Sequence, residues 1–92
     1  MNKYNLLVGK KLEHCRKTIG ITQEQMGKAI GLDNKKIHRY EHALTMIPIN
    51  ALYMYSIMFK IPMEDFANED LSSEGFKKIY PKSHFAALKP KK

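Results

Sequence analysis

The stretch from Thr22 to Glu41 constrains the fold of this chain more than any other part of it. Thr22 is followed three residues later by Gln25, which is the spacing of a capping box at the start of a helix. Gly31 comes where that helix must stop, because glycine accepts the left-handed conformation at little cost. Asp33 is a favourable N-cap for a second helix. The stretch therefore predicts two short helices joined by a tight turn, which together form a helix-turn-helix.

Each of these two helices has an apolar face and a polar face. Met26, Ala29 and Ile30 recur at helical spacing in the first helix, and Ile37 and Tyr40 do so in the second. The outward face of the second helix carries Asn34, Lys35, Lys36, His38, Arg39 and His42. Lys35 and Lys36 lie in its first turn, at the positive end of the helix dipole, where each lysine lowers the stability of the helix by a few tenths of a kcal/mol. A solvated face tolerates such lysines, but together with the caps and the glycine turn they indicate a surface that binds a polyanion.

The overall charge also favours an anionic partner, either nucleic acid or a membrane surface, because the 92 residues carry a net charge of +7. Residues 63–74 hold five acids and no base, and residues 75–92 hold six lysines and no acid. The single cysteine, Cys15, excludes an intrachain disulfide and fits a reducing cytoplasm. No apolar run reaches the roughly 18 residues that cross a membrane. The basic end lacks a clear amphipathic helix, so we expect no membrane partner.

The chain has no motif that indicates an enzyme or a cofactor site. A glycine-rich phosphate loop, a nucleophile elbow and paired carboxylates beside a base are all missing from the sequence. His38 and His42 are four residues apart on one helix face, a spacing that suits a metal, but no further acid or cysteine completes the site. We therefore expect no catalytic activity, no cofactor and no bound metal.

Three further helices are expected around the central pair. A stripe of apolar residues predicts a first helix over Leu6 to Thr18, Pro48 begins a fourth helix, and Pro62 begins a short fifth helix through Phe66. These patterns predict an all-α fold, a compact five-helix bundle in residues 1–68. Residues 69–92 form an acidic and then basic segment, which we expect to be a flexible tail with one short turn of helix at His84 to Leu88.

The fourth helix has more apolar residues than one buried face requires. Its expected inward face is Ile49, Leu52, Tyr53, Ser56 and Phe59. A second apolar group consists of Met54, Ile57 and Met58 on that helix and Leu44 in the preceding loop, His42 to Ile47. These residues either complete the core or form a surface for a dimer partner or another protein, and the excess favours the second interpretation.

The central residues also carry a family resemblance. The pattern Thr22-Gln23-Glu24-x-Met26 followed by Gly31-Leu32-Asp33 and by Ile37-x-Arg39-Tyr40-Glu41 resembles the Cro and phage-repressor helix-turn-helix family, often called the xenobiotic-response-element (XRE) family. The resemblance covers about Val8 to Phe66 and implies a phage-repressor-like, DNA-binding bundle with the helix-turn-helix at helices two and three. It also implies an ion pair between Arg16 and Glu41 that holds the first helix against the third.

The same resemblance implies roles for individual residues. It assigns base reading to Asn34, Lys35 and Arg39. It assigns contacts with the DNA phosphates to Thr22, Gln23, Lys36 and His38. Family members act as two-fold dimers on half-sites about one helical turn apart. The implied protein is a homodimeric transcriptional regulator, expected to be a repressor, in the cytoplasm and at the nucleoid of a bacterium or encoded by a phage.

Three positions depart from the family pattern. Gly27 stands where alanine is common, and Ala43 and Lys60 stand where glycine is common. The loop that contains Leu44 is apolar where many relatives have basic residues that contact phosphate. This loop keeps an alternative function open, in which the same fold is a protein-interaction module such as an antitoxin-like subunit or an adaptor.

Overall fold

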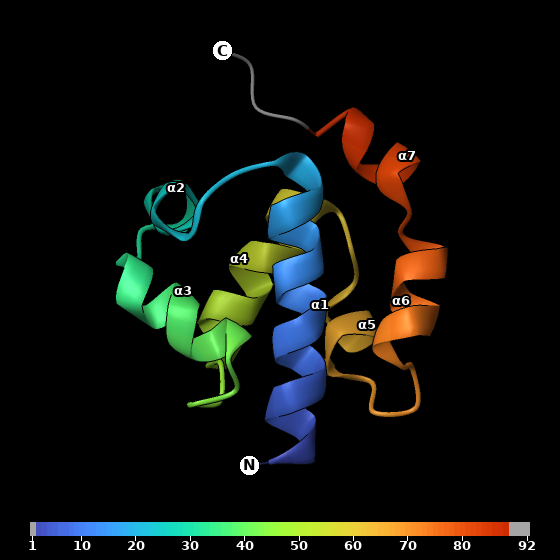
Figure 1. Cartoon of the computed structure of the whole chain (residues 1–92), viewed down its shortest axis with the longest axis horizontal. Coiled ribbons are helices and arrows are strands. Elements are labelled where there is room, and N and C mark those ends of the chain that lie inside the picture. The colour runs from blue at the N-terminus through green and yellow to red at the C-terminus, as the bar shows by residue number, and fades with distance from the viewer. Residues whose placement is uncertain (1, 89–92) are drawn as a thin grey trace.

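The computed structural model describes residues 2–88, and this part of the chain folds into seven α-helices without a strand (Figure 1). In chain order the helices are α1 (Lys3–Ile19), α2 (Gln23–Ile30), α3 (Asn34–Glu41), α4 (Ile49–Phe59), α5 (Met63–Ala67), α6 (Ser73–Ile79) and α7 (Lys82–Ala86). The all-α class predicted from the sequence is confirmed. The five helices predicted for residues 1–68 are present as α1 to α5, and α6 and α7 lie in the segment that was predicted to be a flexible tail.

Helix α1 lies at the centre of the molecule, with α2 and α3 on one side and α6 and α7 on the other (Figure 1). Its apolar stripe is buried, and Val8, Leu12 and Cys15 are almost fully covered. The helix ends at Gly20, whose φ of 78° is left-handed. Because α1 contacts α3, α5, α6 and α7, both sides of the fold depend on its position.

The structure of α2 and α3 follows from their caps. The Thr22 hydroxyl accepts a hydrogen bond from the backbone N–H of Gln25 at 3.0 Å, and the Thr22 N–H donates to the Gln25 side chain at 2.9 Å. Helix α2 ends at Gly31 with a φ of 76°, and Asp33 caps α3 by accepting from the N–H of Lys36 at 3.0 Å. Three residues, 31–33, thus separate the two helices.

Gly27 allows α2 to lie very close to the turn that follows it. A Cβ atom at this position would lie 2.3 Å from the carbonyl oxygen of Leu32. Cβ atoms in proteins essentially never come this close to another heavy atom. The glycine therefore allows a close backbone approach that a side chain at this position would prevent.

Two residues that have side chains also adopt left-handed backbones. Ala43, after α3, has a φ of 61°, and Lys60, at the end of α4, has a φ of 55°. For a residue with a Cβ atom, the left-handed conformation is less favourable than the right-handed one by about 1–2 kcal/mol. The chain thus keeps the backbone shape that glycine would favour, at the cost of local strain.

Helix α4 buries a face that differs from the predicted one. Its buried residues are Ala51, Leu52, Tyr55 and Phe59. Ile49 and Tyr53, both predicted to point inward, are exposed. The prediction failed because this helix is apolar on nearly all sides, so its periodicity does not select the buried one.

Helices α6 and α7 pack into the same core, so the predicted flexible tail is wrong for residues 69–88. Phe76, Tyr80 and Phe85 are buried. The ring of Phe76 lies 5.4 Å from that of Phe66, and the ring of Phe85 lies 5.9 Å from that of Phe59. The lysines of α6 and α7 remain exposed, so the basic composition coexists with a buried aromatic face. The expected helical turn at 84–88 lies at Lys82–Ala86, and residues 89–92 are outside the described part.

Side-chain hydrogen bonds join the C-terminal helices to the rest of the fold and join α1 to the end of α5. The ring nitrogens of His14 and His84 donate to the carbonyls of Tyr80 and Phe59, at 3.0 and 2.8 Å. Lys11 is fully buried, and its Nζ donates to three carbonyls, those of Asp65 (2.8 Å), Phe66 (3.3 Å) and Asn68 (3.0 Å). These carbonyls lie at the C-terminal end of α5, where a helix cannot satisfy them itself. Burial lowers the pKa of Lys11 to about 8, although the charge of Asp65 opposes this shift.

Candidate nucleic-acid interface

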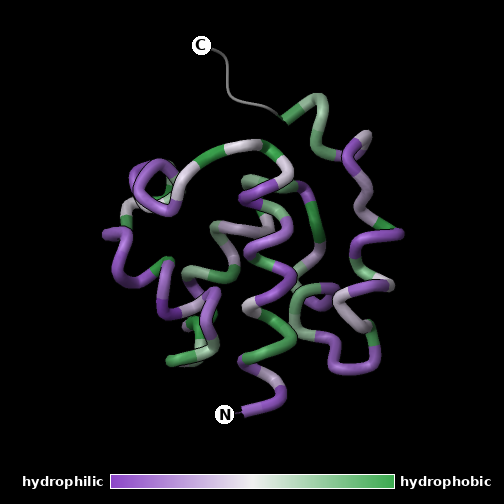
Figure 2. Tube along the Cα trace, in the orientation of Figure 1, coloured by the Kyte–Doolittle hydropathy of each residue, from purple (hydrophilic) through white to green (hydrophobic). Residues whose placement is uncertain are grey.

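The outward face of α3 is exposed and polar. Asn34, Lys35, Lys36, His38 and Arg39 are all exposed, while Ile37 and Tyr40 hold the opposite face against the core. Figure 2 shows α3 as mostly hydrophilic and the segment that follows it as mostly hydrophobic. The cap at Asp33 fixes the start of the helix, and this determines which side chains of the first turn face outward.

Most of the residues predicted to contact DNA surround one shallow depression. Gln23 from α2 and Asn34, Lys35, His38 and Arg39 from α3 line it, together with Leu44 from the following loop. The depression has a volume of about 330 Å³. The helix-turn-helix geometry thus brings together residues that are up to 16 positions apart in the sequence, and adds Leu44, which was predicted to belong to a partner surface.

Two predicted phosphate contacts lie outside this depression. Lys36 is exposed on α3 but does not line it. Thr22 is exposed as well, but its hydroxyl and its N–H are both occupied by the capping box with Gln25. Thr22 therefore has a clear structural role, but its hydroxyl only accepts in the cap, so its O–H remains free to donate to a phosphate.

A buried network holds α3 in place behind its exposed face. Arg16 on α1 and Glu41 on α3 form a bidentate ion pair, with Nε to Oε2 at 2.7 Å and Nη2 to Oε1 at 2.9 Å. Arg16 also donates to the carbonyl of Ile21 at 2.8 Å, and the Glu41 side chain is 0% exposed. The hydrogen bond with Glu41 raises the pKa of Arg16 above its ordinary value.

Gln23 belongs to the same network. Its side-chain amide nitrogen donates to Oε1 of Glu41 at 3.1 Å. Sequence reasoning assigned this side chain to DNA and missed its contact with Glu41, because nothing in the local pattern indicates a partner 18 residues away. The contact links the start of α2 to the end of α3 and leaves the backbone N–H of Gln23 at the exposed start of α2.

The cationic side chains on α3 are free to interact with an anion. None of Lys35, Lys36 and Arg39 forms an ion pair with any residue in the range 2–88. Asp33, the acid next to them in the sequence, uses its side chain to cap the helix. The face therefore presents uncompensated positive charge, and a polyanion would find no competing carboxylate bound to it.

The remaining candidate residues fall into two groups. The rings of His38 and His42 stack with their centroids 4.1 Å apart, and no cluster of three metal-ligating side chains occurs in the described residues.

Leu44, Met54 and Ile57 are exposed, whereas Met58 is half-buried against the core. Met46, Ile49 and Tyr53 are exposed beside them and were not predicted. The sequence did contain a signal for this exposed apolar surface, because residues 42–59 contain no Lys, Arg, Asp or Glu.

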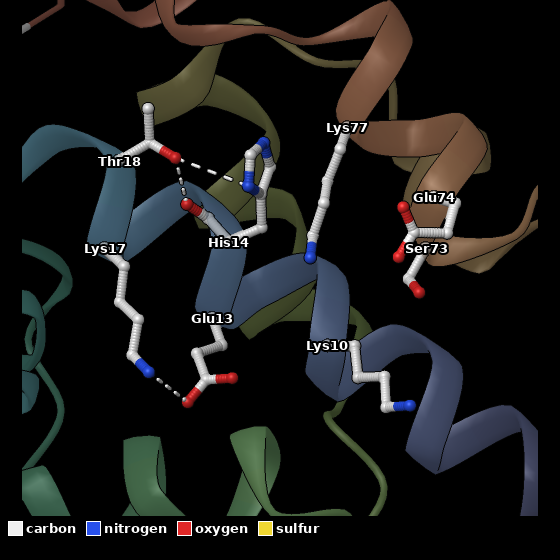
Figure 3. Close-up of a pocket in the computed structure, with 8 residues that line it drawn as sticks. All are labelled: Lys10, Glu13, His14, Lys17, Thr18, Ser73, Glu74 and Lys77. Atoms are coloured by element: carbon white, nitrogen blue, oxygen red, sulfur yellow. Dashed lines mark hydrogen bonds and ion pairs between the residues drawn. The ribbon is translucent and has the colours of Figure 1, made fainter.

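A second depression lies between α1 and α6 (Figure 3). Helix α6 lies on the other side of α1 from α3 (Figure 1). Its volume is about 450 Å³, and the side chains around it are both basic and acidic (Figure 3). Lys17 is 3.2 Å from Glu13, and Lys10 and Lys77 share the site with Glu74. This mixture of opposite charges makes it a weaker candidate for binding a polyanion than the face of α3.

No protein-family model, no curated protein sequence and no solved structure matches this chain. Among the helices in residues 2–88, none has the length and the apolar character needed to cross a membrane.

Proposed function

We propose that this chain is a transcriptional regulator, a repressor, that binds double-stranded DNA sequence-specifically through α2 and α3 and acts as a homodimer. The observation that carries the proposal is the exposed face of α3, where three cationic side chains without an ion pair lie on a helix fixed by the buried Arg16–Glu41 pair. A rigid helix with an uncompensated basic face has the shape and charge to enter the major groove.

The positions of the side chains suggest how bases are read. Asn34 and Lys35 lie in the first turn of α3, and Arg39 lies one turn further along the same face. Asparagine can form a bidentate pair with adenine, and lysine or arginine can bind the N7 and O6 acceptors of guanine. Each good bidentate contact contributes about 1–3 kcal/mol of discrimination against the wrong base.

Contacts with the phosphates would set the register of the helix on the duplex. The backbone N–H of Gln23 at the start of α2 is oriented by the helix and favours an anion. Its side chain is bonded to Glu41, so the network that positions α3 would also position this N–H. Lys36 and His38 supply further contacts that bind every sequence alike. A protein bound in this way would repress by occupying the DNA that a polymerase needs.

The first test is selection from a random pool of double-stranded DNA at about physiological salt, where non-specific binding is weak. Enrichment of a palindrome with half-sites about 10 base pairs apart is expected. Lys35→Ala and Arg39→Ala should each lower the preference for one base by about 5- to 150-fold, which corresponds to 1–3 kcal/mol. The matched control is Lys78→Ala, which removes the same charge from the exposed surface of α6.

Lys36→Ala should instead weaken binding to all sequences about equally and reduce the salt dependence by about one phosphate contact. Failure to enrich any sequence, or base preferences that are unchanged in both Lys35→Ala and Arg39→Ala, would refute the assignment of the base-reading face.

The second candidate function is a protein-interaction module, such as an antitoxin-like subunit or an adaptor. The specific observation in its favour is that the exposed, apolar Leu44 lines the same depression as the basic residues. A leucine cannot neutralise a phosphate, so this position favours an apolar partner over the DNA backbone. A protein partner that co-purifies with the chain and is lost in Leu44→Asp or Met54→Asp, without any DNA preference, would favour this function.

A further inference from the structure

One uncharged segment supplies most of the exposed apolar surface of the described residues. Six large apolar side chains of residues 44–57 are 40 to 75% exposed, and we call them the α4 strip: Leu44, Met46, Ile49, Tyr53, Met54 and Ile57. Outside this segment only Leu6 and Ile79 are large, apolar and comparably exposed in residues 2–88. Single exposed residues of this kind need no explanation, but a contiguous group of six does.

The α4 strip has the geometry of a helix–helix contact. Ile49, Tyr53 and Ile57 are four residues apart, and such residues form one row along the surface of a helix. Leu44 and Met46 precede the row in the loop between α3 and α4. The other side of α4 already packs on the core through Leu52 and Tyr55. A partner helix can therefore lie along the row without disturbing the fold.

The exposed area is large enough for a specific interface. A fully exposed large side chain presents about 200 Å², so the α4 strip exposes on the order of 700 Å². Monomeric proteins rarely carry apolar patches larger than about 300–600 Å². A stable interface covers about 800 Å² on each partner. The strip and the exposed polar residues beside it, Thr45 and Asn50, reach this size.

The charge distribution favours a second copy of this chain as the partner. The chain carries a net charge of +7, so two copies repel each other over most of their surfaces. Residues 42–59 carry no Lys, Arg, Asp or Glu, and two copies can therefore meet here without placing like charges together. An acidic partner would gain nothing from an uncharged surface and would bind the lysines elsewhere.

We propose that the α4 strip is the interface between two copies of this chain, with α4 of one copy antiparallel to α4 of the other. In a two-fold interface the same patch is used by both copies. Tyr53, at the middle of the row, lies near the symmetry axis, and Ile49 of each copy packs against Ile57 of the other. The inference rests on the proposed function only where it concerns DNA: α4 follows α3 in the chain, so the dimer would bring the two recognition faces close to one axis.

The test is the oligomeric state of the full chain without DNA, measured by sedimentation equilibrium between about 1 and 100 µM. The wild type is expected to be a dimer in the upper part of this range. Ile57→Lys should raise the dimer dissociation constant at least tenfold. Ile79→Lys is a closely matched control, because Ile57 and Ile79 are 54% and 55% exposed and each lies in the last turn of its helix. The control should dimerise like the wild type.

Both substitutions change exposed positions, so circular dichroism should show that both variants are folded. Ile49→Asp provides a second variant, since an acid suits the first turn of a helix, and it should also weaken the dimer. A wild type that is monomeric at 100 µM, or equal effects of Ile57→Lys and Ile79→Lys, would overturn the proposal, and binding of the strip to another protein would then have to be considered.

The outcome separates this inference from the proposed function. A dimer that is weakened by Ile57→Lys but selects no DNA sequence supports the α4 interface and refutes the DNA-binding role. A monomer that selects a single half-site supports the DNA-reading face of α3, but it refutes both the α4 interface and the homodimer of the proposed function.

Discussion

The buried ion pair between Arg16 and Glu41 provides a quantitative test of how α3 is held in place. Arg16→Met keeps much of the side-chain volume but removes both hydrogen bonds to the Glu41 carboxylate, which are 2.7 and 2.9 Å long. The carboxylate is 0% exposed and would keep only the Gln23 amide at 3.1 Å. Removing one partner of a buried pair costs about 3–5 kcal/mol. That loss is a large share of the roughly 5–15 kcal/mol that stabilises a domain.

The reverse substitution and the double substitution complete the cycle. Glu41→Met should cost less, about 2–3 kcal/mol, because Arg16 keeps the carbonyl of Ile21 as an acceptor at 2.8 Å. The double variant Arg16→Met/Glu41→Met buries no unpaired charge, and replacing a whole ion pair by apolar residues is often nearly neutral. We expect it to lose about 2 kcal/mol or less, so that the two positions are coupled by at least about 3 kcal/mol.

Urea unfolding followed by circular dichroism at 222 nm measures these free energies. The chain has no tryptophan, so the helical signal is the appropriate probe. The slope of the unfolding free energy against urea concentration should be the same for the wild type and the three variants. This would show that unfolding exposes a similar surface in all four proteins. Effects of the two single substitutions that add to within about 0.5 kcal/mol in the double variant would refute the reasoning, because additivity means that the two groups do not interact.

Three further predictions concern the backbone and the core. Gly27→Ala should lower the free energy of unfolding in urea by about 1–3 kcal/mol, because its Cβ would lie 2.3 Å from a backbone oxygen. Gly75→Ala would place its Cβ 3.2 Å from Leu71 Cδ1 and 3.3 Å from the Ser72 hydroxyl, which are side-chain atoms, so its effect should be smaller than about 1 kcal/mol, and equal effects would contradict the close approach. Lys60→Gly should raise the free energy of unfolding by about 0.5–1 kcal/mol by removing left-handed strain, and a loss would show that the lysine side chain matters more. Cys15 is buried and burial raises its pKa, so at pH 8 an aromatic disulfide reagent should react with the thiol only as fast as the chain unfolds, and rapid labelling of the native chain would be inconsistent with this core.

The helices α2 and α3 could be predicted well because their signals are local. The capping box at Thr22, the left-handed Gly31 and the cap at Asp33 each act within three or four residues, and the structure has all of them. The same holds for the outward position of Lys35 and Arg39, which follows from the start of α3 and the helical period. The exposed face of the candidate site was therefore accessible from the sequence.

The contacts behind that face could not be predicted in the same way, since they depend on partners far away in the chain. Lys11 looks like a surface lysine in the sequence, yet it donates to carbonyls 54 to 57 residues later. Phe76 and Phe85 stand among lysines, so composition suggested a flexible segment, whereas their buried positions depend on Phe66 and Phe59. In α4 the excess of apolar residues was clear, but only packing decides which of them remain exposed.

The central position of α1 has a consequence for the order in which the protein can fold during synthesis. His14 finds its hydrogen-bond partner at Tyr80, 66 residues later. At about 5–20 residues per second, a ribosome needs on the order of 3–13 s to make that stretch. During this interval α2 and α3 can already pack on α1, while its other side, with the buried Lys11, remains uncovered. The face that we propose for DNA can thus form early, and the aromatic rings of α6 and α7 join the core later.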